Sequence, residues 1–317
     1  GSEELWYSTA LKALTNNDSV MVSVYDWGSL HIKVSDLKNR GAIIHLRERY
    51  NSQQRLLEKI WRVTKSKLHF NNQYKAIIDY APDHVIISQG DNFDLVVHHF
   101  ELYSLLFGNN ISYTLICHSH AQFSFIPESN IYPRGKEVFK NAKNVLFVSK
   151  NMQKITERIL CTKLVNAKIT WNPLNLINFE IIRWPESNCI NFAVVGSLTS
   201  SKGQDIILEV LAEDKWRKLE WHLNFYGNGY GEHFLKDLIE YFGLSSRVTF
   251  HGHVSDIKKI WANNHILLIP SAGEGLPISL VEAMICGRPA IVTNVGGNTE
   301  LIVEDETGYI AESPSSY

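Results

Sequence analysis

Short apolar segments of strand length alternate with segments of helix length along almost all of this 317-residue chain. The alternation is typical of parallel sheets covered by helices on both faces. In the first half, we expect strands at 20–25, 42–45, 84–88, 112–117 and 144–148, with helices at 3–14, 92–107 and 151–160. In the second half, we expect strands at 190–195, 221–226, 247–250, 266–269, 290–293 and 308–311, with helices at 202–212, 232–242, 255–262 and 277–285.

A segment with proline separates the two series. Residues 171–175 read WNPLN, and a polar stretch follows up to Asn188. Pro173 removes a backbone donor and fixes the chain, which favours a hinge. We therefore expect two doubly wound, Rossmann-like α/β domains, residues 1–172 and 173–317, which face a central cleft and bind ligands outside the carboxyl ends of their strands. Because the chain opens on a helix and stops soon after a short strand, the first strand and the C-terminal helix of such a fold are expected to lie outside it.

Composition excludes several classes of protein. The hydrophobic fraction of 44% and the charged fraction of 20% are those of a globular domain, not of a disordered chain or a coiled coil. The sequence has neither a run of about 18 apolar residues nor a signal peptide, so we expect a cytoplasmic protein. We expect no nucleic-acid partner. Its four cysteines are far apart and form no CxxC pair, which predicts buried, reduced thiols.

Charge is distributed unevenly along the chain. Residues 1–172 carry 21 Lys and Arg against 15 Asp and Glu, a net +6, whereas residues 173–317 carry 10 against 18, a net −8. The basic excess lies between Arg40 and Lys75, where nine basic residues are opposed by only Glu48 and Glu58. Such a run is typical either of a solvated helical face or of a surface that attracts anionic lipid or an anionic acceptor.

The segment 270–284, PSAGEGLPISLVEAM, directly follows the strand expected at 266–269. Gly275 permits a close backbone approach to a ligand, and Pro277 suits the first turn of a helix whose free N–H groups would stabilise a diphosphate. Glu274 precedes this helix and could hold sugar hydroxyls, while Glu282, about two turns further on, could accept both hydroxyls of a ribose. Taken singly, each glutamate is explained as well by a surface position or by the helix dipole. The combination favours a binding site.

Glu274 and Glu282 resemble the E-x7-E signature of retaining GT-B glycosyltransferases, in the large family numbered four (glycosyl transferases group 1). The resemblance extends over the second half of the chain almost without interruption. It implies the GT-B fold, with a first domain for the acceptor and a second domain for the nucleotide-sugar donor. It also implies that Gly275, Leu276 and Pro277 lie against the donor.

Further motifs of the second half support the same resemblance. Residues 195–203 resemble the family's V-G-R-L…K-G element, which implies that Gly196 forms the tight turn and that Lys202 binds the donor diphosphate. Ser197 stands where the family most often has arginine, so one cationic donor to the diphosphate is lost. The turn at 295–300, VGGNTE, resembles the family's G-G-x-x-E turn, which is usually structural with some donor contact.

Two weaker motifs complete the expected donor site. Residues 226–229, YGNG, resemble the family's G-x-G loop, which places Gly227 near the donor; the missing Rossmann pattern argues against NAD. Residues 250–254, FHGHV, resemble F-x-G-x-V, which implies that the backbone of His253 and Val254 meets the nucleotide base. The two histidines could also suggest a metal, but a third ligand at suitable spacing is missing from the sequence. We therefore expect neither metal nor cofactor.

In the first half, residues 117–120, CHSH, resemble the family's H-S-H segment. The resemblance implies that His118, directly after a strand, contacts the reacting sugar; a hydrogen-bonded core histidine is the alternative. His120 is a further candidate for the acceptor or phosphate side. Gly1 and Ser2 resemble the end of the family's G-G-x-E loop near the phosphates and acceptor.

The resemblance implies transfer of a sugar from a UDP- or GDP-sugar, with retention at the anomeric carbon, to a glycan or lipid-linked acceptor in polysaccharide or glycolipid biosynthesis. His118 and Glu274 would be the catalytic residues. In this light the basic run Arg40–Lys75 favours peripheral contact with an anionic membrane at its inner face. Two alternatives stay open: a non-catalytic GT-B protein that binds a sugar nucleotide, and an epimerase or phosphorylase on the same fold.

Overall fold

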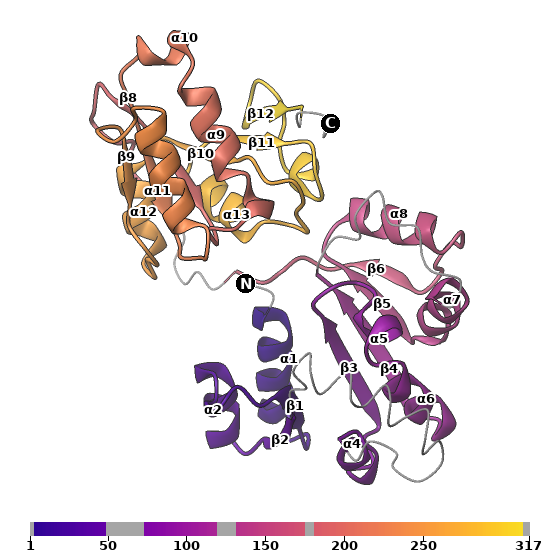
Figure 1. The fold of residues 1–317 in the computed structure, drawn as a ribbon. Coiled ribbons are helices and arrows are strands. Elements are labelled where there is room, and N and C mark those ends of the chain that lie inside the picture. Colours follow the sequence, from indigo (N-terminus) through magenta and orange to yellow (C-terminus); the bar gives the residue numbers. More distant parts are fainter. Residues whose placement is uncertain (1–2, 49–72, 119–130, 175–180, 313–317) are drawn as a thin grey trace. The chain divides into compact units, whose positions relative to one another are not determined.

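A computed structural model describes residues 3–48, 73–118, 131–174 and 181–312 (Figure 1). The chain divides into two compact units that interleave along the sequence. The first unit comprises Gly1–Ile116, Pro127–Leu146 and Lys163–Lys168, and the second comprises Cys117–Ile126, Phe147–Thr162 and Ile169–Tyr317. Segments from the first half of the chain therefore cluster with the second half, in place of a single boundary. The division at residue 172 and the acceptor and donor roles stay predictions.

The first half of the chain contributes two sheets within the described residues (Figure 1). Strands β1 (Met21–Tyr25) and β2 (Ile43–Arg47) pair in parallel, and β3 (His84–Gln89), β4 (Ser112–Cys117), β5 (Asn144–Phe147) and β6 (Ala167–Ile169) form a second sheet in that order. The helices are α1 (Glu3–Thr15), α2 (Ile32–Asn39), α4 (Lys75–Asp79), α5 (Asp94–Val97), α6 (Phe100–Gly108), α7 (Ile131–Asn141) and α8 (Lys150–Ile159). One sheet was expected here, and β6 was not predicted.

The helix expected at 92–107 is in fact two helices. Helix α5 ends at Val97 and α6 begins at Phe100, with His98 and His99 between them. His99 has a φ of −130° and ψ of 26°, which is outside the helical region, so the backbone turns there. The apolar periodicity continues across the break, which explains why the sequence alone predicts one helix.

The second half contributes a six-stranded parallel sheet with the order β12-β11-β10-β7-β8-β9. Its strands are β7 (Ile190–Val195), β8 (Trp221–Tyr226), β9 (Val248–Phe250), β10 (Ile266–Ile269), β11 (Ala290–Thr293) and β12 (Gly308–Ala311). The helical segments are η1 (Ser200–Lys202), α9 (Gln204–Leu211), α10 (Asp214–Arg217), α11 (Glu232–Tyr241), α12 (Ile257–Asn263), α13 (Ile278–Ile285) and η2 (Asn298–Glu300). The expected strands are confirmed here, nearly all with the same bounds.

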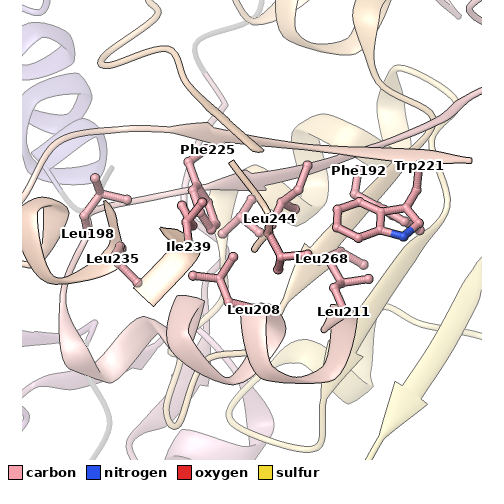
Figure 2. Close-up of a cluster of buried hydrophobic side chains, with 12 residues drawn as sticks. Phe192, Leu198, Leu208, Leu211, Trp221, Phe225, Leu235, Ile239, Leu244 and Leu268 are labelled. Carbon is pink, nitrogen blue, oxygen red and sulfur yellow. The ribbon is translucent and has the colours of Figure 1, made fainter. Parts of the chain in front are cut away.

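Both faces of this sheet are covered, because successive side chains of a strand point to opposite faces. Phe192 and Val194 of β7 join a cluster with side chains of α9 and α11, as Figure 2 shows for its labelled members. Ala193 of β7 joins a second cluster, which includes Trp261 of α12 and Leu280 of α13. Burial on both faces accounts for the nearly continuous apolar sequence of these strands.

The strand order reverses between β7 and β10, the neighbours at the centre of the sheet. The chain runs from β7 to β8 and β9 on one side, and then returns to place β10 on the other side of β7. In open parallel sheets, ligands bind at the carboxyl ends of strands at such a switch point. A ligand is therefore expected at the loops that follow β7 and β10.

The cysteines are all free thiols. Cys117 and Cys286 are buried, as expected, whereas Cys161 is exposed and Cys189 is half-buried. The prediction of buried thiols is thus wrong for these two, because Cys161 follows the end of α8 and Cys189 precedes β7.

Candidate functional site

The loops after β7 and β10 contact each other through their backbones. The N–H of Ala272 donates to the carbonyl of Ser201 at 2.9 Å. Gly203 has a φ of +66°, and a Cβ there would overlap with the carbonyl oxygen of Pro270. The expected helix 202–212 is interrupted at this glycine, so Lys202 lies in η1 and α9 begins at Gln204. This close approach brings Lys202 to the β10 loop.

Glu274 accepts two hydrogen bonds on one carboxylate oxygen. The ammonium of Lys202 lies 2.5 Å from Glu274 Oε1, and the hydroxyl of Ser271 donates to the same atom at 2.7 Å. Glu274 is only 9% exposed, and Oε2 makes no hydrogen bond within the described part of the chain. The arrangement fixes the carboxylate and leaves Oε2 available to a ligand hydroxyl. The sequence predicted Lys202 and Glu274 in one site, and the structure brings them together. Ser271 was not predicted from the sequence.

The loops after β8 and β9 adjoin the β7 loop. Gly227 has a φ of 136°, donates its N–H to the carbonyl of Gly252 at 2.7 Å, and leaves no room for a Cβ against the carbonyl of Gly196. His253 is exposed and Val254 half-buried beyond this contact. The predicted donor residues Gly196, Gly227, His253 and Val254 thus lie on adjacent loops at one edge of the sheet.

Helix α13 begins at Ile278, with Pro277 as the N-cap residue at φ −67°. Leu276, directly before it, is 7% exposed and therefore fills space more than it contacts solvent. On the helix, burial raises the pKa of the half-buried Glu282 carboxyl to about 7. A carboxyl with this pKa gains or loses its proton near neutral pH. A ligand that donates hydrogen bonds to the carboxylate would lower this pKa and keep the group ionised.

His118 lies against the β10 loop within the second unit. A Cβ on Gly275 would overlap with the carbonyl oxygen of His118 and approach Val148 Cγ2 at 3.2 Å. Gly275 in turn accepts a hydrogen bond on its carbonyl from the N–H of Gly297 at 2.7 Å. Only a glycine fits at position 275 without displacing one of these backbones. The candidate catalytic residues His118 and Glu274 therefore flank the same glycine.

The side chain of Ser197 brings no charge to this site. Its carbonyl accepts a hydrogen bond from the Gln204 amide at 2.9 Å, which holds the β7 loop to the first turn of α9. Lys202 is accordingly the cation that the β7 loop supplies. Gly1, Ser2 and His120 lie outside the described residues, as do residues 49–72 of the basic run.

A carboxylate that the sequence treated only as part of a turn connects two segments of the second unit. Glu300 accepts the N–H of Lys150 at 3.1 Å and that of Asn151 at 2.8 Å, at the N-terminus of α8. The Asn151 amide donates to the carbonyl of Gly296 at 2.9 Å. Because Gly296 and Gly297 contact the backbone of Glu274 and Gly275, these bonds support the loop that carries Glu274.

A polar network joins the exposed His251 to the buried side chains of Asn224, Asn264 and Tyr226, at the ends of β8 and β9. His251 bonds Asn224 Oδ1 at 2.7 Å, and Asn224 donates to Asn264 Oδ1 at 2.9 Å. The Asn264 amide donates to the Tyr226 hydroxyl at 2.8 Å, and the Tyr226 and His251 rings stack at 4.6 Å. The network fixes the end of β8 against the start of the His251–His253 loop. The one sequence signal for it was Asn224, a polar residue inside the apolar strand β8.

Groups of three or more His, Cys, Asp or Glu side chains placed to hold a metal ion are absent from the described residues. Likewise, none of the described helices is long and apolar enough to span a membrane.

Comparison with known proteins gives this site its context. Residues 182–317 match the family described as glycosyl transferases group 1. An uncharacterized glycosyltransferase of Methanocaldococcus jannaschii is 30% identical over 183 residues, which cover 52% of this chain and 45% of that protein. The lipopolysaccharide core biosynthesis mannosyltransferase LpcC of Rhizobium leguminosarum bv. viciae is 33% identical over 121 residues, 36% of this chain and 34% of that protein. The matched part of the chain spans less than half the length of either relative.

Solved structures are similar over nearly the whole chain. HepE of Anabaena in complex with UDP has a TM-score of 0.70 at 18% identity and covers 97% of this chain and 82% of its own. The lipopolysaccharide outer core galactosyltransferase WaaB in its apo form has a TM-score of 0.69 at 17% identity, with 99% and 83% covered. At these identities the likeness establishes the fold, so the predicted α/β class and GT-B fold are confirmed.

Proposed function

We propose that the chain transfers a glycosyl group from a UDP- or GDP-sugar to a glycan or lipid-linked acceptor, with retention at the anomeric carbon, in polysaccharide or glycolipid biosynthesis. The observation that carries the proposal is the buried Glu274 carboxylate, which Lys202 and Ser271 hold on one oxygen at the switch point of the sheet. The family match of residues 182–317 and the glycosyltransferase relatives support it. So does the UDP bound in the HepE structure.

The donor would bind along the carboxyl edge of the second sheet. A diphosphate beside Lys202 gains an ion pair, and the free N–H groups at the start of α13 add a positive dipole end. Glu282 on α13 would accept the ribose hydroxyls. The free Oε2 of Glu274 would accept a hydroxyl of the donor sugar and so orient the ring.

The chemistry that these residues can supply is stabilisation of charge. Departure of the nucleoside diphosphate leaves an oxocarbenium-like sugar and an anion; the anion is stabilised by Lys202 and the α13 N-terminus without a metal ion. A phosphate oxygen of the leaving group then accepts the proton of the acceptor hydroxyl, which attacks the same face of the sugar. His118, next to Gly275, would position groups around the reacting carbon.

A donor panel tests the proposal. UDP-, GDP- and ADP-sugars are offered to the full chain, and donor hydrolysis and transfer are measured beside nucleotide binding. Glu274→Gln keeps the side-chain shape but removes the carboxylate, and we expect at least a roughly hundredfold loss of transfer with nucleotide affinity nearly unchanged. The matched control is Glu232→Gln, whose carboxylate also pairs with a lysine, Lys236, but on the solvent-exposed face of α11.

Two results of the panel would count against the enzyme. If none of the donors binds, the proposal fails as a whole. If a donor binds but is neither hydrolysed nor transferred with any acceptor offered, the chain is a sugar-nucleotide-binding protein rather than a transferase.

The basic run Arg40–Lys75 supports a peripheral contact with the inner face of an anionic membrane, as a further part of this proposal. Phosphate groups of anionic lipids attract clustered Lys and Arg within a Debye length of the surface. Co-sedimentation with vesicles is expected to increase with the fraction of anionic lipid and to decrease with salt. Binding that ignores both would contradict the proposed contact.

A further inference from the structure

Tyr25 and Arg47 lie side by side at the carboxyl edge of the two-stranded parallel sheet formed by β1 and β2. They are the last residues of β1 and β2 and are partners in the ladder between the two strands. Two residues earlier, Ser23 and His45 are paired in the same way, and their side chains bond at 3.0 Å. Because strand side chains alternate, both pairs lie on one face of the sheet. The carboxyl end of a parallel sheet is where α/β domains bind their ligands.

The Arg47 guanidinium packs on an aromatic ring. Its Cζ atom lies 4.3 Å from the centroid of the Tyr25 ring, and the side chain as a whole is half-buried. A cation on a ring face keeps its N–H edge free to bond in the plane of the guanidinium. The Nε atom of Arg47 is buried and makes no hydrogen bond. A buried charged donor without an acceptor is unfavourable unless a ligand supplies one.

Tyr25 and Tyr74 contact the guanidinium, and both of their hydroxyls bond His99. His99 bonds the Tyr25 hydroxyl through Nε2 at 3.2 Å and the Tyr74 hydroxyl through Nδ1 at 2.7 Å. Burial raises the pKa of Tyr74 to about 12, so the phenol keeps its proton; the charge of Arg47, and the hydrogen bond that the guanidinium donates to the Tyr74 hydroxyl, oppose that rise. The edge of the sheet thus holds one fixed cation among neutral hydroxyl groups.

Within the described residues, Arg47 forms no ion pair with a carboxylate. Among the ion pairs of the described residues, Arg40 pairs with Asp36 and Lys33 pairs with Glu4, but none involves Arg47. The carboxylate of Glu101 influences Tyr74, although more weakly than Arg47 does. An arginine that is held on a ring, and that has no carboxylate partner among the described residues, is suited to bind an oxyanion through two parallel hydrogen bonds.

We propose that Arg47, on the ring of Tyr25 and beside the Tyr74 hydroxyl, binds an oxyanion of phosphate or carboxylate type. The identity of the ligand rests on the proposed function: the oxyanion belongs to the acceptor, which is therefore an acidic glycan or a phosphate-bearing lipid. The oxyanion site itself does not depend on donor chemistry. It would place the acidic group of the acceptor at the two-stranded sheet of the first unit, whereas the Lys202 loop that serves the donor belongs to the second unit.

Inorganic phosphate is the probe for the site. It is added to the full chain carrying Lys202→Met, a substitution that removes the cation expected to bind the donor phosphate. Isothermal titration should give saturable binding, and Arg47→Met should weaken it by at least about tenfold. Arg47→Lys keeps the charge but loses the fork and should bind with intermediate affinity. The matched control is Arg134→Gln, because Arg134 also packs on a ring, that of Phe100 at 4.5 Å, but lies on α7. Circular dichroism confirms that each variant is folded.

A second arm distinguishes the source of the oxyanion. Phosphatidylcholine vesicles with and without phosphatidic acid are tested with the Arg47→Met and Arg134→Gln variants. Selective loss of phosphatidic-acid binding by Arg47→Met supports a lipid phosphate, and loss of inorganic phosphate binding alone supports a soluble acidic acceptor. The inference is overturned if Arg47→Met binds phosphate and vesicles as well as Arg134→Gln does, or if phosphate does not bind in the first place. If phosphate binds through Arg47 but UDP and UDP-sugars do not bind, the proposed function fails while the oxyanion site stands.

Discussion

Ser271 illustrates at the scale of a residue how a buried carboxylate is given one orientation. Its hydroxyl and the Lys202 ammonium converge on Glu274 Oε1, while its own carbonyl accepts a hydrogen bond from the Thr293 hydroxyl at 2.6 Å. The serine is 2% exposed, so water cannot replace it readily. Ser271 is therefore a positioning residue for the group that we expect to orient the donor sugar.

Ser271→Ala should lower the turnover of transfer by about tenfold, because one hydrogen bond to a charged group is worth roughly 1.5–3 kcal/mol and only part of it is realised in the transition state. The affinity for UDP, which lacks the sugar, should change by less than about twofold. Ser187→Ala removes an exposed serine of the same unit and is the control. Equal losses in UDP affinity and turnover would show that Ser271 supports the fold of the loop instead.

Glu282 makes a separate prediction at the same scale, about stability. Burial raises its pKa from 4.5 to about 7, so the folded protein favours the neutral acid. The stability that this residue contributes is fully present below pH 4.5 and is lost as the pH rises through 7. Between pH 5 and pH 8, the loss is at most about 3 kcal/mol.

Glu282→Gln should remove this loss, because glutamine has no charge to desolvate. Denaturant unfolding, followed by hydrogen exchange of α13 amides at pH 5 and pH 8, measures it for the wild type and the variant. Glu232→Gln, on the solvent-exposed face of α11, should keep the slope of the wild type. A wild-type slope that survives in Glu282→Gln would mean that other groups cause it.

At the scale of elements, α8 has two N-terminal caps from different parts of the chain. The hydroxyl of Ser149 accepts the N–H of Met152 at 3.2 Å, and Glu300 accepts the N–H groups of Lys150 and Asn151. A carboxylate at this position also stabilises the positive end of the helix dipole. Helix α8 and the turn at η2 are thereby held together, although about 150 residues separate them.

Glu300→Ala should expose the first amides of α8 to solvent exchange. Loss of a cap costs roughly 1 kcal/mol, which corresponds to about fivefold to tenfold faster exchange at Lys150 and Asn151. Glu306→Ala, an exposed glutamate a few residues later, is the control and should leave these amides protected. If exchange at the start of α8 is unchanged, then Ser149 alone is sufficient to cap the helix.

Elements of the second half could be predicted almost completely from the sequence, and those of the first half less well. Strands β7, β8, β10, β11 and β12 have the predicted bounds because each is a short apolar run bounded by turn residues. The helix break at His98–His99 and the strand β6 were not predicted, because both depend on tertiary contacts. At the site, Lys202 and Glu274 were predictable from motifs, whereas Ser271 is identified only by the bond that it donates.

At the scale of the whole molecule, the net charge differs between the two halves of the chain, at +6 for residues 1–172 and −8 for 173–317. These halves do not coincide with the two units, because the units interleave along the sequence. The expected donor residues from Gly196 to Glu282, together with His118, all belong to the second unit, and Arg47 belongs to the first. Nucleotide and acceptor oxyanion are therefore expected to bind different units. Each ligand should stabilise chiefly the unit that binds it, because stabilisation by a ligand is confined to the states that the ligand binds.

Hydrogen exchange with and without UDP can separate the two contributions. At about 100 times the dissociation constant, UDP should raise the protection of the second unit by about 2.7 kcal/mol where exchange requires that unit to unfold. Amides of β1, β2 and α6 should keep their exchange rates with UDP and gain protection only with phosphate. Lys202→Met should abolish most of the UDP effect and leave the phosphate effect in the first unit. Protection of β1 and β2 by UDP alone would show instead that the nucleotide site draws on both units.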